Sequence, residues 1–167
     1  MHKAVAAAGS LVFLVIAPGF VAGLVPRWIT GWQVREPMPY WLGLRVLGAG
    51  LIISGTAVLL HAFARFVVEG AGTPAPVAAP GKLVVGGLYR HVRNPMYVAV
   101  LAIVAGQALL LGQLRLLLYA AVLFACFSAF VRWYEEPNLS RRFGEEYEAY
   151  RRAVPAWLPR LRPWKQA

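Results

Sequence analysis

Residues 88–97 read LYRHVRNPMY, and a long apolar run begins before this stretch has ended. Proline suits the first turn of a helix and disfavours helical backbone in its predecessor, so Asn94-Pro95 predicts a helix start. Three potential cations stand directly before that start: Arg90, His91 and Arg93. Polar groups are costly beside a membrane span, and a helix N-terminus favours anions. The stretch predicts a spanning helix with an anion-binding polar cluster at the membrane surface.

Composition sets the broad class of protein. The 167 residues are 59% hydrophobic and 14% charged, with a mean hydropathy of +0.58, which predicts one small integral membrane domain over residues 1–167. The net charge is +10, but the cations flank apolar runs, so we expect anionic lipid headgroups and no nucleic acid as the counterpart. The single cysteine, Cys126, leaves no disulfide or multi-cysteine metal site to propose.

Four apolar runs are close to the length of about 20 residues that crosses a bilayer. They are residues 4–25, 41–66, 96–114 and 116–133. A signal peptide is the alternative for the first run, but three further runs favour a membrane helix. We expect residues 26–40 to connect the first two spans along the membrane surface, residues 73–81 to form a proline-rich loop, and residues 134–167 to form a cytosolic helical segment. The expected fold is an all-α membrane bundle with about four transmembrane helices.

Some small and polar residues within the spans allow two interpretations. His61 and Arg65 share a helix face and either line a ligand site or lie at the interface as an ordinary histidine and a snorkelling arginine. Gly50, Ser54 and Gly55 form a small-residue patch that favours close helix packing. Ala99, Ala102 and Gly106 either leave room for a lipid chain or pack against a neighbouring helix.

The distribution of charge predicts orientation and a second polar cluster. With four spans, thirteen of the 17 Lys and Arg residues fall on one side, which places both termini in the cytoplasm. Five of seven glutamates follow the fourth span, and Glu135-Glu136 stands at its exit. This pair can meet the cations before Pro95 and form a cation-binding half-site. The alternative is simple pairing with Arg93 or Arg132 at the interface.

Three motifs in order carry a resemblance to a known superfamily. Residues 87–97 read GLYRHVRNPMY, residues 135–139 read EEPNL, and residues 143–147 read FGEEY, with Tyr150 following. These motifs strongly resemble the isoprenylcysteine carboxyl methyltransferase and phospholipid N-methyltransferase superfamily, and residues 69–76 look like its bacterial members. The resemblance covers residues 67–164.

The resemblance implies S-adenosylmethionine (SAM) bound at the cytosolic face, between the last two spans and the C-terminal segment, and a lipid or isoprenoid-like substrate that arrives through the membrane. Carried onto the matching positions, it implies cofactor binding by Tyr89, Arg90, His91, Asn94, Pro95, Tyr97, Glu135, Glu136 and Leu139. It assigns catalytic roles to His91, Arg93 and Asn94.

Asn94 departs from the family pattern, because many members have histidine at this position. Asparagine can hydrogen-bond a ligand but cannot accept a proton near neutral pH as histidine can. A carboxylate acceptor is already a nucleophile at neutral pH, whereas an amine must lose a proton, for which His91 is the nearest candidate by sequence. Two other functions stay open: an NADPH-dependent membrane reductase of the sterol-reductase type, and a membrane protein without chemistry that binds anionic lipids.

Overall fold

A computed structural model describes residues 3–65, 68 and 82–165, and all regular structure in this part of the chain is helical. The elements in chain order are α1 (Lys3–Gly19), the π-turn η1 (Phe20–Leu24), α2 (Val25–Thr30), α3 (Leu42–Arg65), the 3-10 turn η4 (Gly87–Arg90), α4 (Pro95–Leu111), α5 (Arg115–Phe130), the π-turn η5 (Val131–Glu135) and α6 (Glu136–Ala153). The proline-rich loop expected at residues 73–81 lies outside the described residues, as does the last residue of the expected span 41–66.

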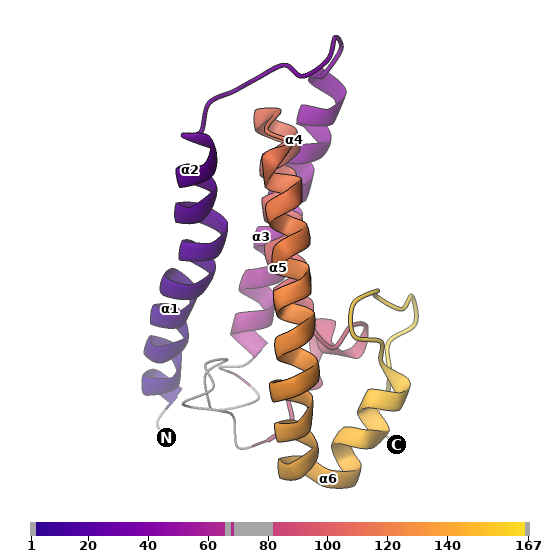
Figure 1. Ribbon diagram of the computed structural model, residues 1–167. Helices are drawn as coiled ribbons and strands as arrows, with labels where there is room; N and C mark the ends of the chain where they lie inside the picture. Colours follow the sequence, from indigo (N-terminus) through magenta and orange to yellow (C-terminus); the bar gives the residue numbers. More distant parts are fainter. Residues whose placement is uncertain (1–2, 66–67, 69–81, 166–167) are drawn as a thin grey trace.

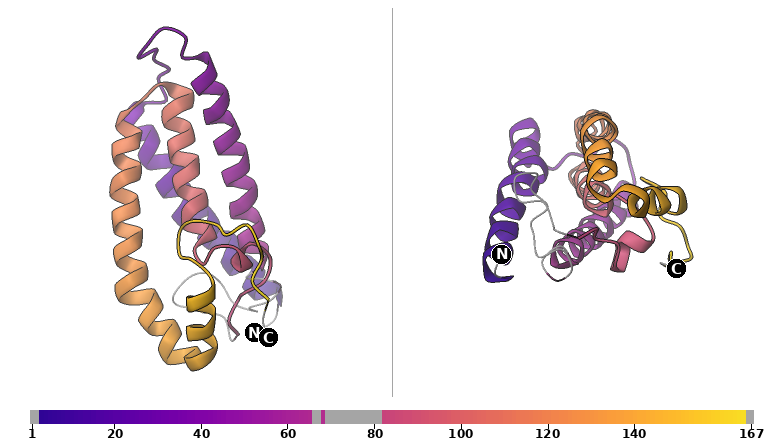
Figure 2. Two further views of the ribbon diagram at one scale, coloured as in Figure 1. Left: turned by 90° about the vertical axis from the view of Figure 1, so that its right-hand side faces the viewer. Right: turned by 90° about the horizontal axis from the view of Figure 1, so that it is seen from below.

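The helices form an elongated bundle (Figure 1). The rod of α1 and α2 stands on one side, α3, α4 and α5 run alongside one another, and α6 folds back at one end (Figure 2). Among the described residues, three helical stretches are long and apolar enough to cross a membrane, namely Leu11–Thr30, Leu42–Arg65 and Arg115–Ala153, and α4 is a shorter apolar helix. The expected all-α membrane bundle is confirmed.

Two predicted helix ends are wrong, and in both cases a proline follows shortly after the predicted end. The first helix continues through η1 and α2 to Thr30, although its end was expected at Val25. The helix of the fourth span, expected to end at Trp133, continues through η5 into α6. Pro26 and Pro137 each stand in the first turn of the following α-helix, directly after a π-turn. The wider π-turn accommodates the proline ring, which would otherwise clash with the preceding turn. The third helix ends at Leu111 instead of residue 114, because Gly112 adopts a left-handed conformation with φ of 66°.

Glycines bring α3 and α4 into backbone contact. A Cβ on Gly48 would lie 2.6 Å from the carbonyl oxygen of Gly106, and a Cβ on Gly106 would lie 2.7 Å from that of Gly48. A Cβ on Gly55 would lie 3.0 Å from the carbonyl oxygen of Ala99. Ala99 and Gly106 therefore serve helix packing, which was one of the two interpretations of these residues.

Side-chain hydrogen bonds attach the first helix to the bundle. Pro26 has no N–H and so cannot bond the carbonyls one turn before it. The amide of Gln107 on α4 donates to the Ala22 carbonyl at 2.6 Å, and the Tyr119 hydroxyl on α5 donates to the Val21 carbonyl at 2.9 Å. These two bonds satisfy backbone groups that would be costly to leave unpaired in lipid.

Candidate active site

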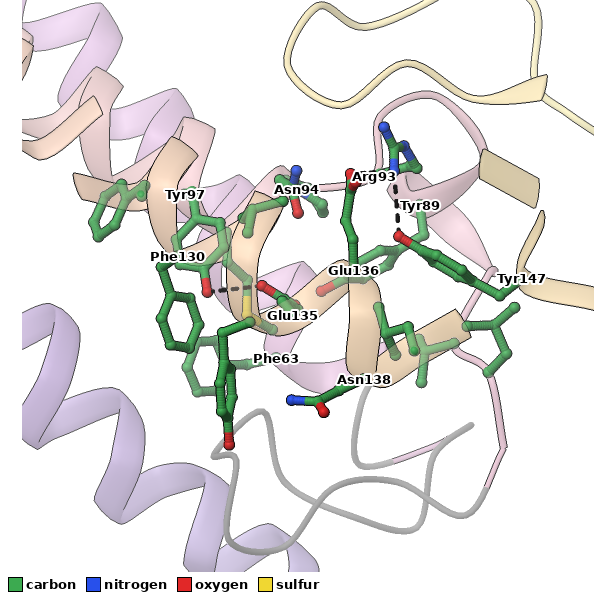
Figure 3. Close-up of a pocket in the computed structure, with 18 of the residues that line it drawn as sticks. Phe63, Tyr89, Arg93, Asn94, Tyr97, Phe130, Glu135, Glu136, Asn138 and Tyr147 are labelled. Carbon is green, nitrogen blue, oxygen red and sulfur yellow. Dashed lines mark hydrogen bonds and ion pairs between the residues drawn. The ribbon is translucent and has the colours of Figure 1, made fainter. Parts of the chain in front are cut away.

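A cavity of about 700 Å³ lies where α4 begins and α5 passes into α6 (Figure 3). Its polar end is formed by the start of α4, by η5 and by α6. Its apolar end extends between the first helix and the bundle. Both ends belong to one continuous space, whose volume is within the range of roughly 300–1,000 Å³ typical of ligand sites.

Glu135, the last residue of η5, and Glu136, the first residue of α6, have different partners. Successive helical residues point in directions about 100° apart, so neighbouring carboxylates diverge. Glu135 faces α4 and accepts a hydrogen bond from the Tyr97 hydroxyl at 3.1 Å (Figure 3). Burial is the largest cause of a raised pKa at Glu135, and Glu136 adds to it, while the hydrogen bond from Tyr97 and the charge of Arg93 act in the opposite direction.

Arg93 and Glu136 form a buried ion pair. Arg93 Nη1 lies 2.7 Å from Glu136 Oε1, and the two side chains are only 13% and 14% exposed. The same nitrogen donates to the Tyr147 hydroxyl at 3.3 Å, and Arg151 reaches the other oxygen of Glu136 at 3.5 Å. The Nε of Arg93 is buried and has no hydrogen-bond partner. The predicted pairing of Arg93 with one of the two glutamates thus occurs at Glu136 and leaves Glu135 without an ion pair in the described structure.

The N-terminus of α4 borders the cavity without a side-chain cap. Asn94 occupies the cap position, but its side chain makes no capping bond, and its Nδ2 donates to the Ala156 carbonyl at 3.2 Å. Met96 and Tyr97 in the first turn line the cavity. A first helical turn leaves backbone N–H groups without intrahelical acceptors, so this end of α4 favours an anion.

Most predicted site residues line the cavity. They are Tyr89, Arg93, Asn94, Pro95, Tyr97, Glu135, Glu136 and Leu139. Arg90 and His91 are not among the lining residues and instead bind the C-terminal segment. Arg90 Nε donates to the Trp164 carbonyl at 2.6 Å, and His91 Nδ1 lies 2.8 Å from the Arg160 carbonyl oxygen. A carbonyl only accepts, so the proton of His91 must be on Nδ1 in this bond.

His61 and Arg65 also lie outside the cavity. Both pack against the turn η4, where a Cβ on Gly87 would meet His61 Nε2 at 2.7 Å and Arg65 Nε at 2.8 Å. Gly87 has φ of 56°, and the space beside it is closed by these two side chains. The two residues share a face as predicted, but they support η4 and do not form a wall of this cavity.

Several lining residues were missed by the sequence analysis. On the polar side these are Lys82, Asn138, Arg142, Phe143, Tyr147 and Tyr150. Tyr147 is fully buried, and this burial raises its pKa to about 12, with the charge of Glu136 as the next cause. The hydroxyl of Tyr150 donates to the Tyr89 carbonyl at 2.7 Å. Both tyrosines stood in the third motif, so their presence there was the available signal.

The residues offered beforehand as room for a lipid chain, Ala99, Ala102 and Gly106, are not among those that line the apolar side of the cavity. This side is lined by Phe13, Ala17, Pro18, Val21, Leu59, Phe63, Val100, Phe127 and Phe130, from the first helix, α3, α4 and α5. The rings of Phe13 and Phe63 stack with centroids 6.2 Å apart and so connect the first helix to α3. These side chains offer no polar group to a ligand, so this part of the cavity suits a hydrocarbon chain.

The fold and cavity define a class: a helical membrane bundle with a continuous cavity that is polar where α4 begins and apolar between the first helix and the bundle. Residues 43–146 match the phospholipid methyltransferase family, and because this is more than half of the chain, the protein belongs to that family. Over 78 residues it is 40% identical to protein-S-isoprenylcysteine O-methyltransferase of Schizosaccharomyces pombe (strain 972 / ATCC 24843). The match covers 46% of this chain and 33% of the relative, so this chain aligns with about a third of that protein. No solved structure matches the chain.

Proposed function

We propose that the protein is an integral membrane methyltransferase that uses SAM to methylate a lipid-like or isoprenoid acceptor at the cytosolic face of the membrane. The observation that carries this proposal is the single cavity that joins Glu135 and Arg93 to an apolar space between the first helix and the bundle. Family membership and the isoprenylcysteine O-methyltransferase relative support the reaction type.

Opposite charges at the polar end suit the two ends of the methionine moiety of SAM. Glu135 is positioned to accept hydrogen bonds from an ammonium or from ribose hydroxyls, because in the described part of the chain it pairs with the Tyr97 hydroxyl and with no cationic side chain. Arg93 Nε and the free N–H groups of the first turn of α4 are positioned to bind a carboxylate. Tyr147 and Glu136 hold the Arg93 side chain in place for this contact.

The residues of the site perform mainly positioning. SAM supplies an electrophilic methyl group on a sulfonium, and alignment of the nucleophile with that methyl group accounts for most of the rate enhancement we propose. For a carboxylate acceptor no base is needed, which fits a site with Asn94 in place of the family histidine. His91 is held at the C-terminal segment, so we do not assign it the role of proton acceptor.

The apolar end is proposed to take the tail of the acceptor, which enters sideways from the bilayer. Each buried CH₂ contributes about 0.8 kcal/mol, so a prenyl or acyl chain binds there without polar recognition. Phe63 and Phe127 border this space near the polar end. We further propose that both termini are cytoplasmic, as the distribution of cations predicts. The likeness of residues 69–76 to bacterial members of the superfamily leads us to propose a bacterial inner membrane.

Titration of the detergent-purified protein with SAM and with NADPH tests the assignment. We expect saturable SAM binding that Glu135→Gln weakens roughly tenfold to a hundredfold, the value of a hydrogen bond between charged groups. Binding of NADPH instead would favour a reductase, and binding of neither would favour a lipid-binding protein without chemistry.

Transfer of label from methyl-labelled SAM identifies the acceptor. The enzyme in a bilayer is given either a total lipid extract or a soluble metabolite extract, and we expect label only in the lipid fraction. A prenylated cysteine and an ethanolamine phospholipid then distinguish O-methylation from N-methylation. Label confined to water-soluble products would contradict lateral entry even with methyl transfer intact.

A further inference from the structure

The segment that follows α6, residues 154–165, returns to the side of the bundle and does not extend away from it (Figure 1). It lies across α4 and α5 from the first helix, so it is separate from the apolar end of the cavity (Figure 2). The ring of Trp157 packs edge-on against Phe124 of α5 with centroids 5.0 Å apart, and it lies 6.4 Å from the ring of Tyr97. These contacts fix the height of the loop along the bundle.

That height corresponds to the hydrocarbon boundary. With 17 residues, α4 is about 25 Å long, which is less than the roughly 30 Å thickness of a bilayer core. Its first turn, with Tyr97, therefore lies at or inside the edge of the core. Phe124 lies six residues before the last residue of α5, Phe130, which places it about 9 Å from that end along the helix axis. The side chain of Phe124 is 44% exposed on the bundle surface.

The outer surface of the loop is apolar at its tip and basic beside it. Leu158 is 79% exposed and Leu161 is 98% exposed, although neither contributes to a core. Arg162 and Lys165, also exposed, follow them in the chain. Adjacent apolar and cationic side chains of this kind suit the boundary between acyl chains and anionic headgroups.

Part of the loop backbone is satisfied from inside the protein, as an irregular segment near lipid requires. Side chains of Arg90, His91 and Asn94 bond the carbonyls of Trp164, Arg160 and Ala156, respectively. In the reverse direction, the N–H groups of Arg160 and Trp164 donate to the carbonyls of His91 and Arg90, each at 2.9 Å. The polar cluster before α4 thus supplies partners to a segment that would otherwise need water.

We propose that residues 155–165 form an interfacial membrane anchor, with Leu158 and Leu161 among the acyl chains and Arg162 and Lys165 at the phosphates of anionic lipids. Trp157 occupies the aromatic belt position between them. The partner is the bilayer itself. This assignment replaces the expectation that the whole segment 134–167 is cytosolic, and it holds whatever reaction the cavity performs.

Spin-label accessibility measures the depth of the loop directly. Single cysteines replace Leu158 or Leu161 in a Cys126→Ser background, with Glu145→Cys on the exposed surface of α6 as the matched control. The labelled proteins are reconstituted into vesicles of equal parts phosphatidylcholine and phosphatidylglycerol. Collision with oxygen, which concentrates in hydrocarbon, is compared with collision with a water-soluble nickel chelate.

We expect labels at positions 158 and 161 to favour oxygen and to exclude the chelate at least several-fold better than the label at position 145. Equal chelate access at all three positions would overturn the proposal. A second comparison uses the double variant Arg162→Gln, Lys165→Gln with the label at position 161. In anionic vesicles the substitutions should lower the preference of this label for the hydrocarbon, whereas in vesicles of phosphatidylcholine alone they should not. An equal change in both kinds of vesicle would contradict the headgroup contact.

Discussion

The two glutamates of the second motif should respond oppositely to the same substitution. Glu136→Gln removes the charge that compensates Arg93, and both side chains are nearly buried. Removing one partner of a buried pair costs about 3–5 kcal/mol. The glutamine oxygen remains available to Arg93, which recovers part of this cost, so we expect a loss of about 2–3 kcal/mol. The contact of Glu136 with Arg151 adds little, because Arg151 is 46% exposed.

Glu135→Gln should leave the protein as stable or make it more stable near neutral pH. Burial holds the pKa of Glu135 above its ordinary value of 4.5, so the folded protein binds this proton more tightly than the unfolded chain does. The corresponding stabilisation is complete below about pH 4.5 and is lost as the pH rises through the folded-state pKa. The glutamine has no charge to desolvate and still accepts the bond from Tyr97.

Thermal unfolding in one detergent at about pH 5 and about pH 8 checks both expectations. At about 2–4 °C per kcal/mol, Glu136→Gln should lower Tm by roughly 4–12 °C. Glu135→Gln should gain stability relative to the unmodified protein as the pH rises. The reasoning is refuted when Glu135→Gln has a lower Tm than Glu136→Gln, or when the Tm of Glu136→Gln equals that of the unmodified protein.

Three further substitutions test the packing and the orientation. Gly48→Val should destabilise the α3–α4 pair by about 1–3 kcal/mol, since its Cβ would collide with the backbone of α4. Unfolding in mixed micelles measures this loss, and Gly50→Val, at a position with open space, is the control. Gln107→Leu should cost about 1–2 kcal/mol in the same assay because it leaves the Ala22 carbonyl unpaired, and an unchanged midpoint would contradict that role. In a Cys126→Ser background, a cysteine at Leu114 should be labelled from outside intact cells and one at position 145 should be protected; the reverse pattern would invert the proposed topology.

Apolar periodicity and length were sufficient to locate the helical bundle, but not the helix ends near Pro26 and Pro137. The predicted spans ended where the apolar runs end, at residues 25 and 133, shortly before these prolines. A π-turn that precedes the proline removes the clash of its ring with the preceding turn, and one extra residue in a turn leaves no mark in an apolar run. The expected span 96–114 ran past Gly112, whose left-handed conformation ends the helix at Leu111.

At the site, sequence proximity identified the right cluster but not the direction of each side chain. Arg90, His91 and Arg93 are within four residues of one another, yet only Arg93 lines the cavity. The 3-10 turn η4 ends at Arg90 and is followed by irregular backbone, so no helical period relates these positions. The partners of Arg90 and His91 lie about 70 residues later in an irregular loop, where no pattern indicated them.

The two bonds that attach the first helix constrain the order in which the bundle assembles. The Val21 and Ala22 carbonyls find their partners on α5 and α4, which are synthesised after the first helix. Until those helices enter the membrane, two acceptors of the first helix face lipid or residual water, at a cost of several kcal/mol each in hydrocarbon. Although it is translated first, the first helix completes these two bonds, and the wall that it contributes to the cavity, only once α4 and α5 stand beside it.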